Sequence, residues 1–221
     1  MGNKSEIEII ISKIGTDTLI RDGQVDMDYA ANIAEQVWTI RNEGIHTVLV
    51  SSGAGALGGQ EGLTAAWRTV HAEHGLVIEE ILFEENAIDK GLQRVRKSLA
   101  DGKIPLINGV SSEQTDERTG NNDTLAAIVA KDLEAHAVFL TTTDGVLDTE
   151  GFVLPVVSDV RQVTVFNRKS LHGTGGMGTK IRAGMAIAQT GRRVAIANGR
   201  KPDIIKDFAA GRQVGTGITR V

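Results

Sequence analysis

The chain has 221 residues, long enough for one large α/β domain and short for two full domains, and its 41% apolar and 24% charged residues are ordinary for a globular protein. Its formal net charge of −4 lacks the basic excess typical of nucleic-acid-binding domains, and the absence of cysteine excludes disulfides and thiolate metal sites. Because no stretch resembles a signal peptide or approaches the ~18 apolar residues of a membrane helix, we expect a cytoplasmic protein with no nucleic-acid or membrane partner.

Apolar strands alternate with helices along the first half of the chain. β-branched residues over 7–12 predict a buried strand, and Asp26 supplies an N-cap for a helix that ends at Gly44. The elements that follow are a strand over 45–50, a helix through Leu63 and Val70, a strand over 76–83, a helix over 88–99 and a strand over 104–107.

The second half continues this alternation after a polar, turn-rich stretch at 111–120. The predicted elements are a helix capped by Asn122 that carries Leu125 to Leu133, a strand over 137–140, a glycine-rich loop over 173–178, a helix that carries Ile181 to Ala188, and a last clear strand over 194–197. The alternation predicts an α/β fold with a mostly parallel central sheet and helices on both faces, as a single domain over residues 1–221. Ligands of such sheets bind at the carboxyl ends of the strands.

The first two strand ends carry small residues and one lysine. Lys13 closes a buried strand and cannot point into the core at low cost, so it either reaches an anion or simply emerges at the strand end. Gly15, directly after it, allows backbone N–H groups to approach an anion. The segment 51–56 joins the next strand to a helix, which is either an anion site at a helix N-terminus or an ordinary turn.

Two helix starts carry more polar chemistry than a helix cap needs. Asn121, Asn122 and Asp123 stand in a row, and the surplus suggests ligand contacts or an acid that holds cationic side chains in place. The segment 173–180 resembles a P-loop, but its last two residues are inverted to Thr179-Lys180 and no clean apolar strand precedes it. It therefore predicts a nucleotide-phosphate site outside the P-loop class.

Metal and nucleophile signals are absent from the sequence. No His, Asp and Glu cluster has metal-ligand spacing, so we predict no protein metal ligands, and no nucleophile elbow of the G-x-S-x-G kind occurs. His172 adjoins the glycine-rich loop and is at most a minor contact.

Taken together and in this order, these segments resemble the amino-acid kinase family, and within it the glutamate 5-kinases most closely. The matching segments are Lys13–Thr16, Val48–Ala54, Gly59–Leu63, Ile104–Asn108, Gly120–Ala127, Leu140–Val146, Gly173–Lys180, Ile196–Gly199 and Gly211–Thr216. The chain departs from the family pattern at two places. Where the family has N-E-N-D, this chain has Asn108-Gly109-Val110-Ser111, and where the family has G-D-N-D, this chain has Asn121 in place of the first Asp. A stretch of the family pattern is also missing between Ala54 and Gly59, and we expect no C-terminal RNA-binding-like domain.

The resemblance implies transfer of the γ-phosphoryl group of ATP to a small carboxylate substrate, with Mg²⁺ as a cofactor, glutamate as the leading acceptor and a homodimer or larger homo-oligomer as the assembly. It implies that the catalytic residues are Lys13, Asp123 and Lys180. The implied nucleotide contacts are Gly15, Thr16, Gly53, Thr141, Thr142, Thr174, Gly175, Gly176, Met177 and Thr179. The implied substrate contacts are Ser52, Ser111, Asn121 and Asn122.

Two other functions stay open at this point. A uridylate-type kinase of the same fold would favour basic residues near the acceptor, but 109–120 holds only Arg118 against three acidic residues. A non-catalytic nucleotide sensor would fit the altered substrate loop, whereas the presence of Lys13, Asp123 and Lys180 together opposes it.

Overall fold

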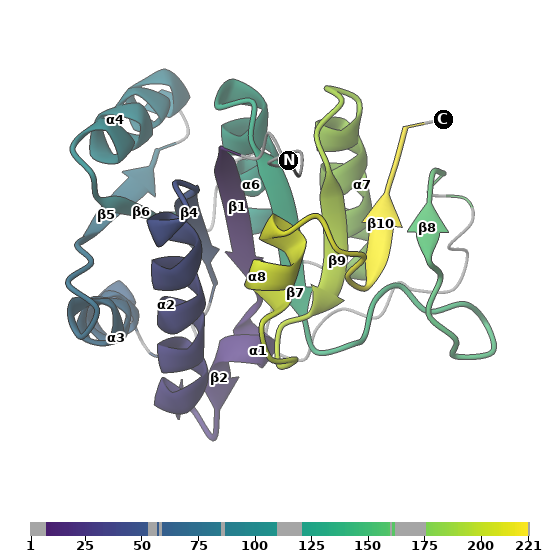
Figure 1. The fold of residues 1–221 in the computed structure, drawn as a ribbon, viewed down its shortest axis with the longest axis horizontal. Helices are drawn as coiled ribbons and strands as arrows, with labels where there is room; N and C mark the ends of the chain where they lie inside the picture. The colour runs from purple at the N-terminus through teal and green to yellow at the C-terminus, as the bar shows by residue number, and fades with distance from the viewer. Residues whose placement is uncertain are drawn as a thin grey trace.

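The computed structural model describes residues 8–52, 57, 59–84, 87–109, 121–159, 161 and 176–220. These residues form an eight-stranded sheet in the order β5-β6-β4-β1-β7-β9-β10-β8, with helices on both faces (Figure 1). Its strands are β1 (Ile9–Ile14), β4 (His46–Ser51), β5 (Ile78–Phe83), β6 (Ile104–Gly109), β7 (His136–Thr141), β8 (Val156–Val157), β9 (Val194–Asn198) and β10 (Thr216–Ile218). The described helices are α1 (Thr16–Leu19), α2 (Met27–Asn42), α3 (Gln60–Ala72), α4 (Ile88–Ala100), α6 (Asn122–Asp132), α7 (Met177–Ala188) and α8 (Ile204–Ala209).

The sheet is mostly parallel, as the alternation of elements predicts. β1 pairs in parallel with β4 on one side and β7 on the other, and the parallel pairing extends through β6 to β5 and from β7 to β9. β10 is antiparallel to β9, and β8 pairs with β10. We expected no clear strand after Ala197, so β10 is a correction. The three residues of β10, with a glycine at the centre, carry no strand signal in the sequence. They form a strand because Thr216 pairs with Ile196 of β9.

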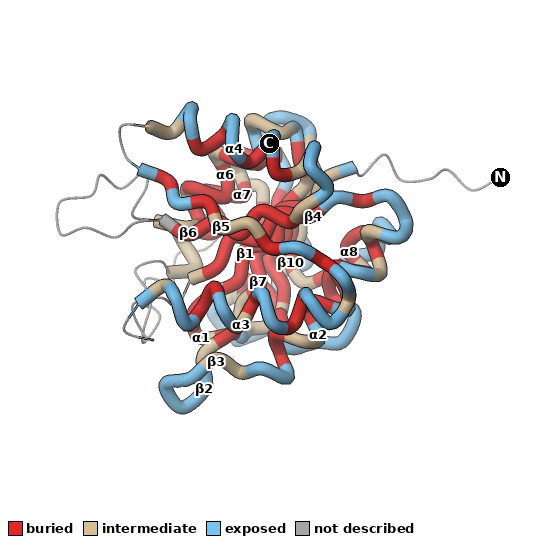
Figure 2. Tube along the Cα trace, turned by 90° about the vertical axis from the view of Figure 1, so that its left-hand side faces the viewer, coloured by how far each residue is buried: buried red, intermediate tan, exposed pale blue. Residues whose placement is uncertain are grey.

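The two helical layers follow from the alternation of side chains along the strands. Ile10 and Ile14 face a core built with α2, α3 and α8, whereas Ile11 faces a second core built with α4, α6 and α7. Figure 2 shows this buried interior between the exposed outer faces of the helices. Since residues two apart on a strand share a face, Lys13 points to the same side as Ile11, towards α6. The strand period therefore decides which face of the sheet this lysine points to, and the packing of α6 on that face brings Asp123 to it.

The start of α2 follows the predicted chemistry, but that of α6 does not. Asp26 caps α2, because its carboxylate accepts the N–H of Tyr29 at 3.1 Å. We predicted Asn122 as the cap of α6, and this is wrong: Asn121 has the extended backbone of a cap, and its Oδ1 accepts the N–H of Asp123 at 2.9 Å. Asn122 is thus already helical, and its side chain donates to Ser52 Oγ instead of capping the helix.

The start of α7 also differs from the prediction. The glycine-rich loop was expected to reach Gly178, but α7 begins at Met177 with Gly176 as its N-cap. Thr179 and Lys180 therefore lie in a regular first helical turn. The short helix α1 and the small hairpin of β2 (Ile20–Arg21) and β3 (Gln24–Val25) were not predicted at all. Among the described helices, none combines the length and the apolar character that a membrane span requires.

Candidate active site

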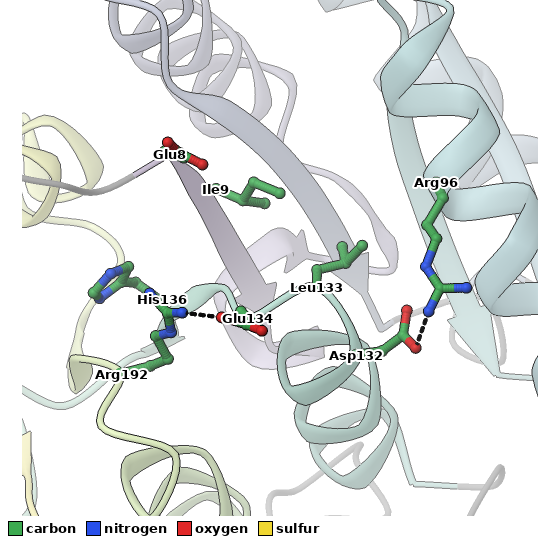
Figure 3. Close-up of a pocket in the computed structure, with 8 residues that line it drawn as sticks. All are labelled: Glu8, Ile9, Arg96, Asp132, Leu133, Glu134, His136 and Arg192. Carbon is green, nitrogen blue, oxygen red and sulfur yellow. Dashed lines mark hydrogen bonds and ion pairs between the residues drawn. The ribbon is translucent and has the colours of Figure 1, made fainter.

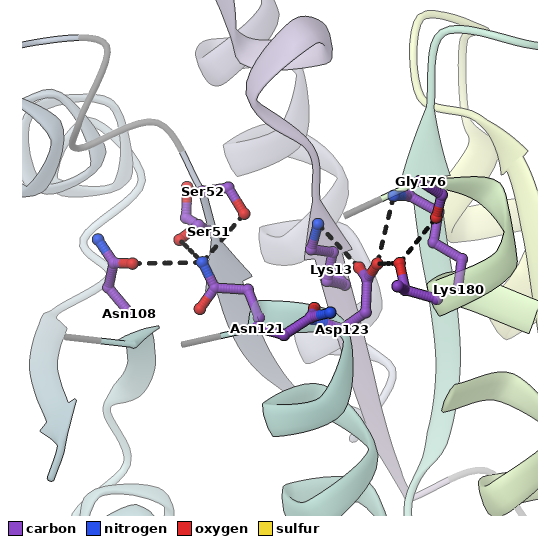
Figure 4. Close-up of polar contacts among 10 residues, drawn as sticks. Lys13, Ser51, Ser52, Asn108, Asn121, Asp123, Gly176 and Lys180 are labelled. Carbon is purple, nitrogen blue, oxygen red and sulfur yellow. Dashed lines mark hydrogen bonds and ion pairs between the residues drawn. The ribbon is translucent and has the colours of Figure 1, made fainter. Parts of the chain in front are cut away.

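The carboxylate of Asp123 lies between two lysines at the carboxyl edge of the sheet (Figure 4). Lys13 Nζ is 2.9 Å from Asp123 Oδ1, and Lys180 Nζ is 3.4 Å from Asp123 Oδ2. All three residues are buried, with 5%, 1% and 8% of the surface of Lys13, Asp123 and Lys180 exposed. The sequence predicted these residues as the catalytic set, and the structure brings them together.

Three separate elements deliver these side chains to one place. Lys13 comes from the carboxyl half of β1, Asp123 from the first turn of α6, and Lys180 from the first turn of α7. α6 and α7 pack side by side in the same helical layer, so their first turns meet above β1. Thr179, one residue before the lysine, donates a hydrogen bond to Asp123 Oδ2 at 2.6 Å and another to the carbonyl oxygen of Gly176 at 2.7 Å.

The charges of the trio shape its protonation. Burial by itself would raise the pKa of Asp123, but the charges of Lys13 and Lys180 and the Thr179 hydroxyl outweigh it and hold this pKa at about 2. Burial, together with the charge of Lys13, lowers the pKa of Lys180, while Asp123 opposes that change. Two ammonium groups share one carboxylate here. Asp17 adds a weaker negative charge that acts on Lys180. Because buried charge is costly without a partner, two ammonium groups that converge on the Asp123 carboxylate suit an anionic ligand such as a phosphate.

A second polar cluster lies on the β4 and β6 side of the trio. Asn122 Nδ2 donates to Ser52 Oγ at 3.0 Å and lies 3.4 Å from both the carbonyl oxygen of Ser51 and Asn108 Oδ1. Figure 4 labels Ser51, Ser52 and Asn108 of this cluster. The Ser51 side chain is held in place by a buried hydrogen bond, because its Oγ accepts the indole N–H of the fully buried Trp67 at 3.0 Å. The cluster offers amide and hydroxyl groups to a ligand, and its members among the described residues, Ser51, Ser52, Asn108 and Asn122, carry no charge.

Asn108 belongs to this cluster, and the site prediction missed it. It is 5% exposed, and its Nδ2 is a buried donor without a hydrogen-bond partner among the described residues. A buried donor left unpaired is costly, which suggests that a ligand oxygen completes it. The available signal was its place near the end of a predicted strand. In the structure Leu106 and Ile107 pair with Leu49 and Val50, which brings the ends of β6 and β4 together.

The predicted nucleotide contacts lie on the other side of β1. Thr16 is buried at the start of α1, and Thr141 ends β7, where its carbonyl oxygen accepts the N–H of Gly199 at 2.9 Å. The Gly15 N–H, expected to face a phosphate, already donates to the carbonyl oxygen of Leu140 at 3.3 Å. Thr142 is exposed at the rim. The remaining predicted contacts, Gly53, Ser111, Thr174 and Gly175, lie outside the described residues.

This rim carries charged groups that the prediction did not include. Asp144 pairs with Lys201 at 3.1 Å and accepts the side-chain N–H of Asn198 at 2.9 Å. These two contacts tie the segment after β7 to the segment after β9, so they brace the edge of the site near Thr141.

A hollow of about 610 Å³ lies at the opposite edge of the sheet, where β1 and β7 begin (Figure 3). Its charged groups are already paired, Arg96 with Asp132 and Arg192 with Glu134. His136 Nδ1 accepts the backbone N–H of Arg193 at 2.9 Å. The hollow contains none of the predicted site residues, and the carboxyl edge remains the candidate active site.

Comparison with known proteins identifies relatives of this chain. Residues 56–198 match the model of the amino acid kinase family. The chain belongs to the amino acid kinase family. It is 31% identical to the glutamate 5-kinase of Alcanivorax borkumensis and 30% identical to that of Kosmotoga olearia, with 93% and 96% of this chain covered. It spans 65% and 68% of the length of those two proteins.

The first of these alignments also bears on the shortened family pattern. It runs over 245 positions, more than the 221 residues of this chain, so part of it lies opposite gaps in this chain. Among solved structures, the UMP kinase of Ureaplasma parvum matches with a TM-score of 0.67 at 14% identity, covering 96% of this chain and 100% of that one. At this identity the match shows a shared fold, in agreement with the predicted fold class.

Proposed function

We propose that this amino acid kinase transfers the γ-phosphoryl group of ATP to a carboxylate oxygen of a small substrate, with glutamate as the first candidate. The observation that carries the proposal is the buried Asp123 carboxylate between Lys13 and Lys180, with neutral amide and hydroxyl groups beside it. Positive groups at that point suit a transferring phosphoryl group, and neutral donors suit a carboxylate. The glutamate 5-kinase relatives support the same reaction.

In the proposed reaction, a substrate carboxylate oxygen forms a bond to the γ-phosphorus while the bond from that phosphorus to the bridging oxygen of ADP breaks. The products are an acyl phosphate and ADP. The transition state of such transfers is loose and spreads negative charge over the equatorial oxygens, so positioning and charge stabilisation supply most of the catalysis. Lys13 and Lys180 would stabilise this charge. Asp123 would hold the two ammonium groups and would not act as a base, because the carboxylate nucleophile carries no proton to remove.

Among the described residues, the cluster on the substrate side of the site offers hydrogen-bond donors to a carboxylate and no acidic side chain to an amine. Ser52, Asn108 and Asn122 can donate hydrogen bonds to a carboxylate, but none of them carries the negative charge that would pair with a substrate ammonium group. Asn121 likewise replaces the acidic residue of the family pattern. We therefore expect a raised KM for glutamate or a preference for a related carboxylate without a free amine.

Magnesium would enter with ATP. Among the residues that the structure describes, no group of three or more His, Cys, Asp or Glu side chains is placed to hold a metal ion. Mg²⁺ commonly takes one or two carboxylates at most, together with substrate phosphates and water, so this donor set fits a cation held mainly by the triphosphate. When bound, Mg²⁺ would neutralise part of the triphosphate charge.

The test is a hydroxamate assay, which traps acyl phosphates, run with ATP and with glutamate, N-acetylglutamate, aspartate and UMP side by side. Acyl phosphate formation from one of the carboxylates is the expected result. Efficient phosphorylation of UMP alone would instead support the uridylate-type alternative, to which the Ureaplasma parvum enzyme draws attention. Calorimetric binding of ATP without turnover of any acceptor would support the nucleotide sensor. Light scattering on the same sample tests the proposed homo-oligomer.

A further inference from the structure

Asp17 stands beside the trio but takes no part in the mechanism above. It is the second residue of α1 and follows Lys13 by four positions. The Gly15 N–H, which donates to the carbonyl oxygen of Leu140, ties the start of α1 to the end of β7. In the sheet, β7 lies on one side of β1, while β4 and β6, which carry the Ser52 and Asn108 cluster, lie on the other. Asp17 is therefore on the proposed nucleotide side.

One carboxylate oxygen of Asp17 is left without a partner. Its Oδ1 is buried and accepts no hydrogen bond, and Asp17 forms no ion pair with any other residue in the described part of the chain. Because α1 follows directly on β1, Asp17 lies at the same carboxyl edge of the sheet as Lys13. Burial and the charge of Lys13 lower the pKa of Lys180, and the negative charge of Asp17 is among the groups that oppose this change. A carboxylate oxygen that is removed from water and unpaired is unfavourable, so this position calls for a cation or a donor.

We propose that the Asp17 carboxylate contacts the Mg²⁺ that accompanies ATP, directly or through one bound water, in the space beside Lys180. This inference rests on the proposed function. Mg²⁺ is a hard cation that binds oxygen and is held in nucleotide sites by one or two carboxylates plus phosphates. The nearby ammonium groups are already shared by Asp123. A substrate ammonium group is a poorer candidate, since the substrate cluster lies across β1 from Asp17.

The test compares ATP affinity with Mg²⁺ and with EDTA, by calorimetry, in the wild type, Asp17→Asn and a control. Asn keeps the size of the side chain and removes its charge. We expect MgATP to bind Asp17→Asn roughly tenfold or more weakly, a loss typical of residues that support a bound metal. Metal-free ATP should bind this variant as well as or better than the wild type, because one negative charge facing the triphosphate is gone.

The matched control is Asp22→Asn. Asp22 is exposed in the turn between β2 and β3, and its φ of 52° is a left-handed conformation that Asn tolerates well. This substitution changes the net charge by the same amount, and both ATP affinities should stay at the wild-type values. Thermal unfolding checks that each variant is folded, and Asp17→Ser replaces Asp17→Asn if the latter is not. Mn²⁺, followed by electron paramagnetic resonance in the presence of ATP, gives a direct reading of cation binding.

The outcomes separate the inference from the proposed function. If Mg²⁺ raises the affinity of the wild type for ATP and raises that of Asp17→Asn by the same factor, the inference is wrong and the proposed function stands. Equal weakening of MgATP and metal-free ATP in Asp17→Asn also overturns the inference, since it points to a role in supporting Lys180. If the wild type binds ATP under neither condition, the proposed function fails, and the inference fails with it.

Discussion

Thr179 donates a hydrogen bond to Asp123 Oδ2 at 2.6 Å, and Lys180 approaches that same oxygen to within 3.4 Å. One helical turn thus supplies both a hydroxyl and an ammonium group to a single carboxylate oxygen. The sequence predicted Thr179 as a nucleotide contact, whereas in the structure its hydroxyl braces the acid that holds the two lysines.

The contribution of the Thr179 hydroxyl to the reaction can be measured without changing either lysine. Thr179→Val keeps the shape and removes the hydroxyl, and a hydrogen bond to a charged group contributes about 1.5–3 kcal/mol. If that contribution is felt mainly in the transition state, kcat should fall by roughly tenfold to a hundredfold with little change in the KM for ATP. Thr179→Ser should restore most of the rate in the same steady-state assay. A raised KM for ATP with unchanged kcat would instead support a direct nucleotide contact.

Removal of either lysine should slow the reaction far more than it weakens substrate binding. Lys13→Ala and Lys180→Ala each remove a positive charge that would act on the transferring phosphoryl group. Loss of one such stabilising group typically lowers kcat by about 10²–10³. Lys131→Ala, an exposed lysine at the far end of α6, is the matched control and should have the wild-type rate. Near-normal kcat in both active-site variants would show that the proposed site is wrong.

The charge of Asp123 should be visible in the pH dependence of stability. Its pKa is about 2 in the folded protein against 3.8 for the ordinary value, so the carboxylate contributes fully above about pH 4 and loses its contribution as the pH falls towards 2. The contribution is about 2 kcal/mol. Urea unfolding of the wild type and Asp123→Asn across this range should show the loss only in the wild type.

At neutral pH the same substitution should destabilise the protein. Asp123→Asn leaves two buried ammonium groups without a carboxylate, and breaking a buried ion pair from one side costs about 3–5 kcal/mol. The substitution does not remove the N-cap of α6, because Asn121 and not Asp123 provides that cap. Identical slopes of stability against pH for both proteins between pH 4 and 2 would contradict the proposed ion-pair network.

Asn121→Asp restores the acidic residue of the family pattern and should shift acceptor preference towards glutamate. Asp caps a helix about as well as Asn, so the melting temperature should barely change. The added negative charge next to the substrate cluster should lower the KM for glutamate by roughly fivefold, the equivalent of about 1 kcal/mol for an exposed charge pair. Acceptors without an amine should not benefit. Asn121→Ala loses the helix cap and so shows how much of any change comes from capping. If Asn121→Asp leaves the ratio of the KM for glutamate to the KM for N-acetylglutamate unchanged, the idea of altered specificity is wrong.

The amino-acid sequence was sufficient to predict the class of fold and the family. Periods of two and 3.6 residues are local, so the buried strands and the helices between them can be read from side chains a few positions apart. The Asp26 cap is equally local, because the carboxylate bonds a backbone group three residues away. The ordered segments around Lys13, Asp123 and Lys180 also needed no coordinates, since the types of residue and their order carry the resemblance.

The contacts between those segments, in contrast, could be found only in the folded chain. Lys180 and Asp123 are 57 positions apart, and Asn122 and Ser52 are 70 apart, so no local pattern could show that they touch. The strand β10 exists because β9 offers it a partner, and the buried amide of Asn108 becomes informative only when its surroundings are known. The same holds for Asp17, an ordinary acid in the sequence whose Oδ1 is buried in the folded chain and accepts no hydrogen bond from the described residues. Burial and long-range pairing are properties of the folded chain, and they decide which polar groups are left for a ligand.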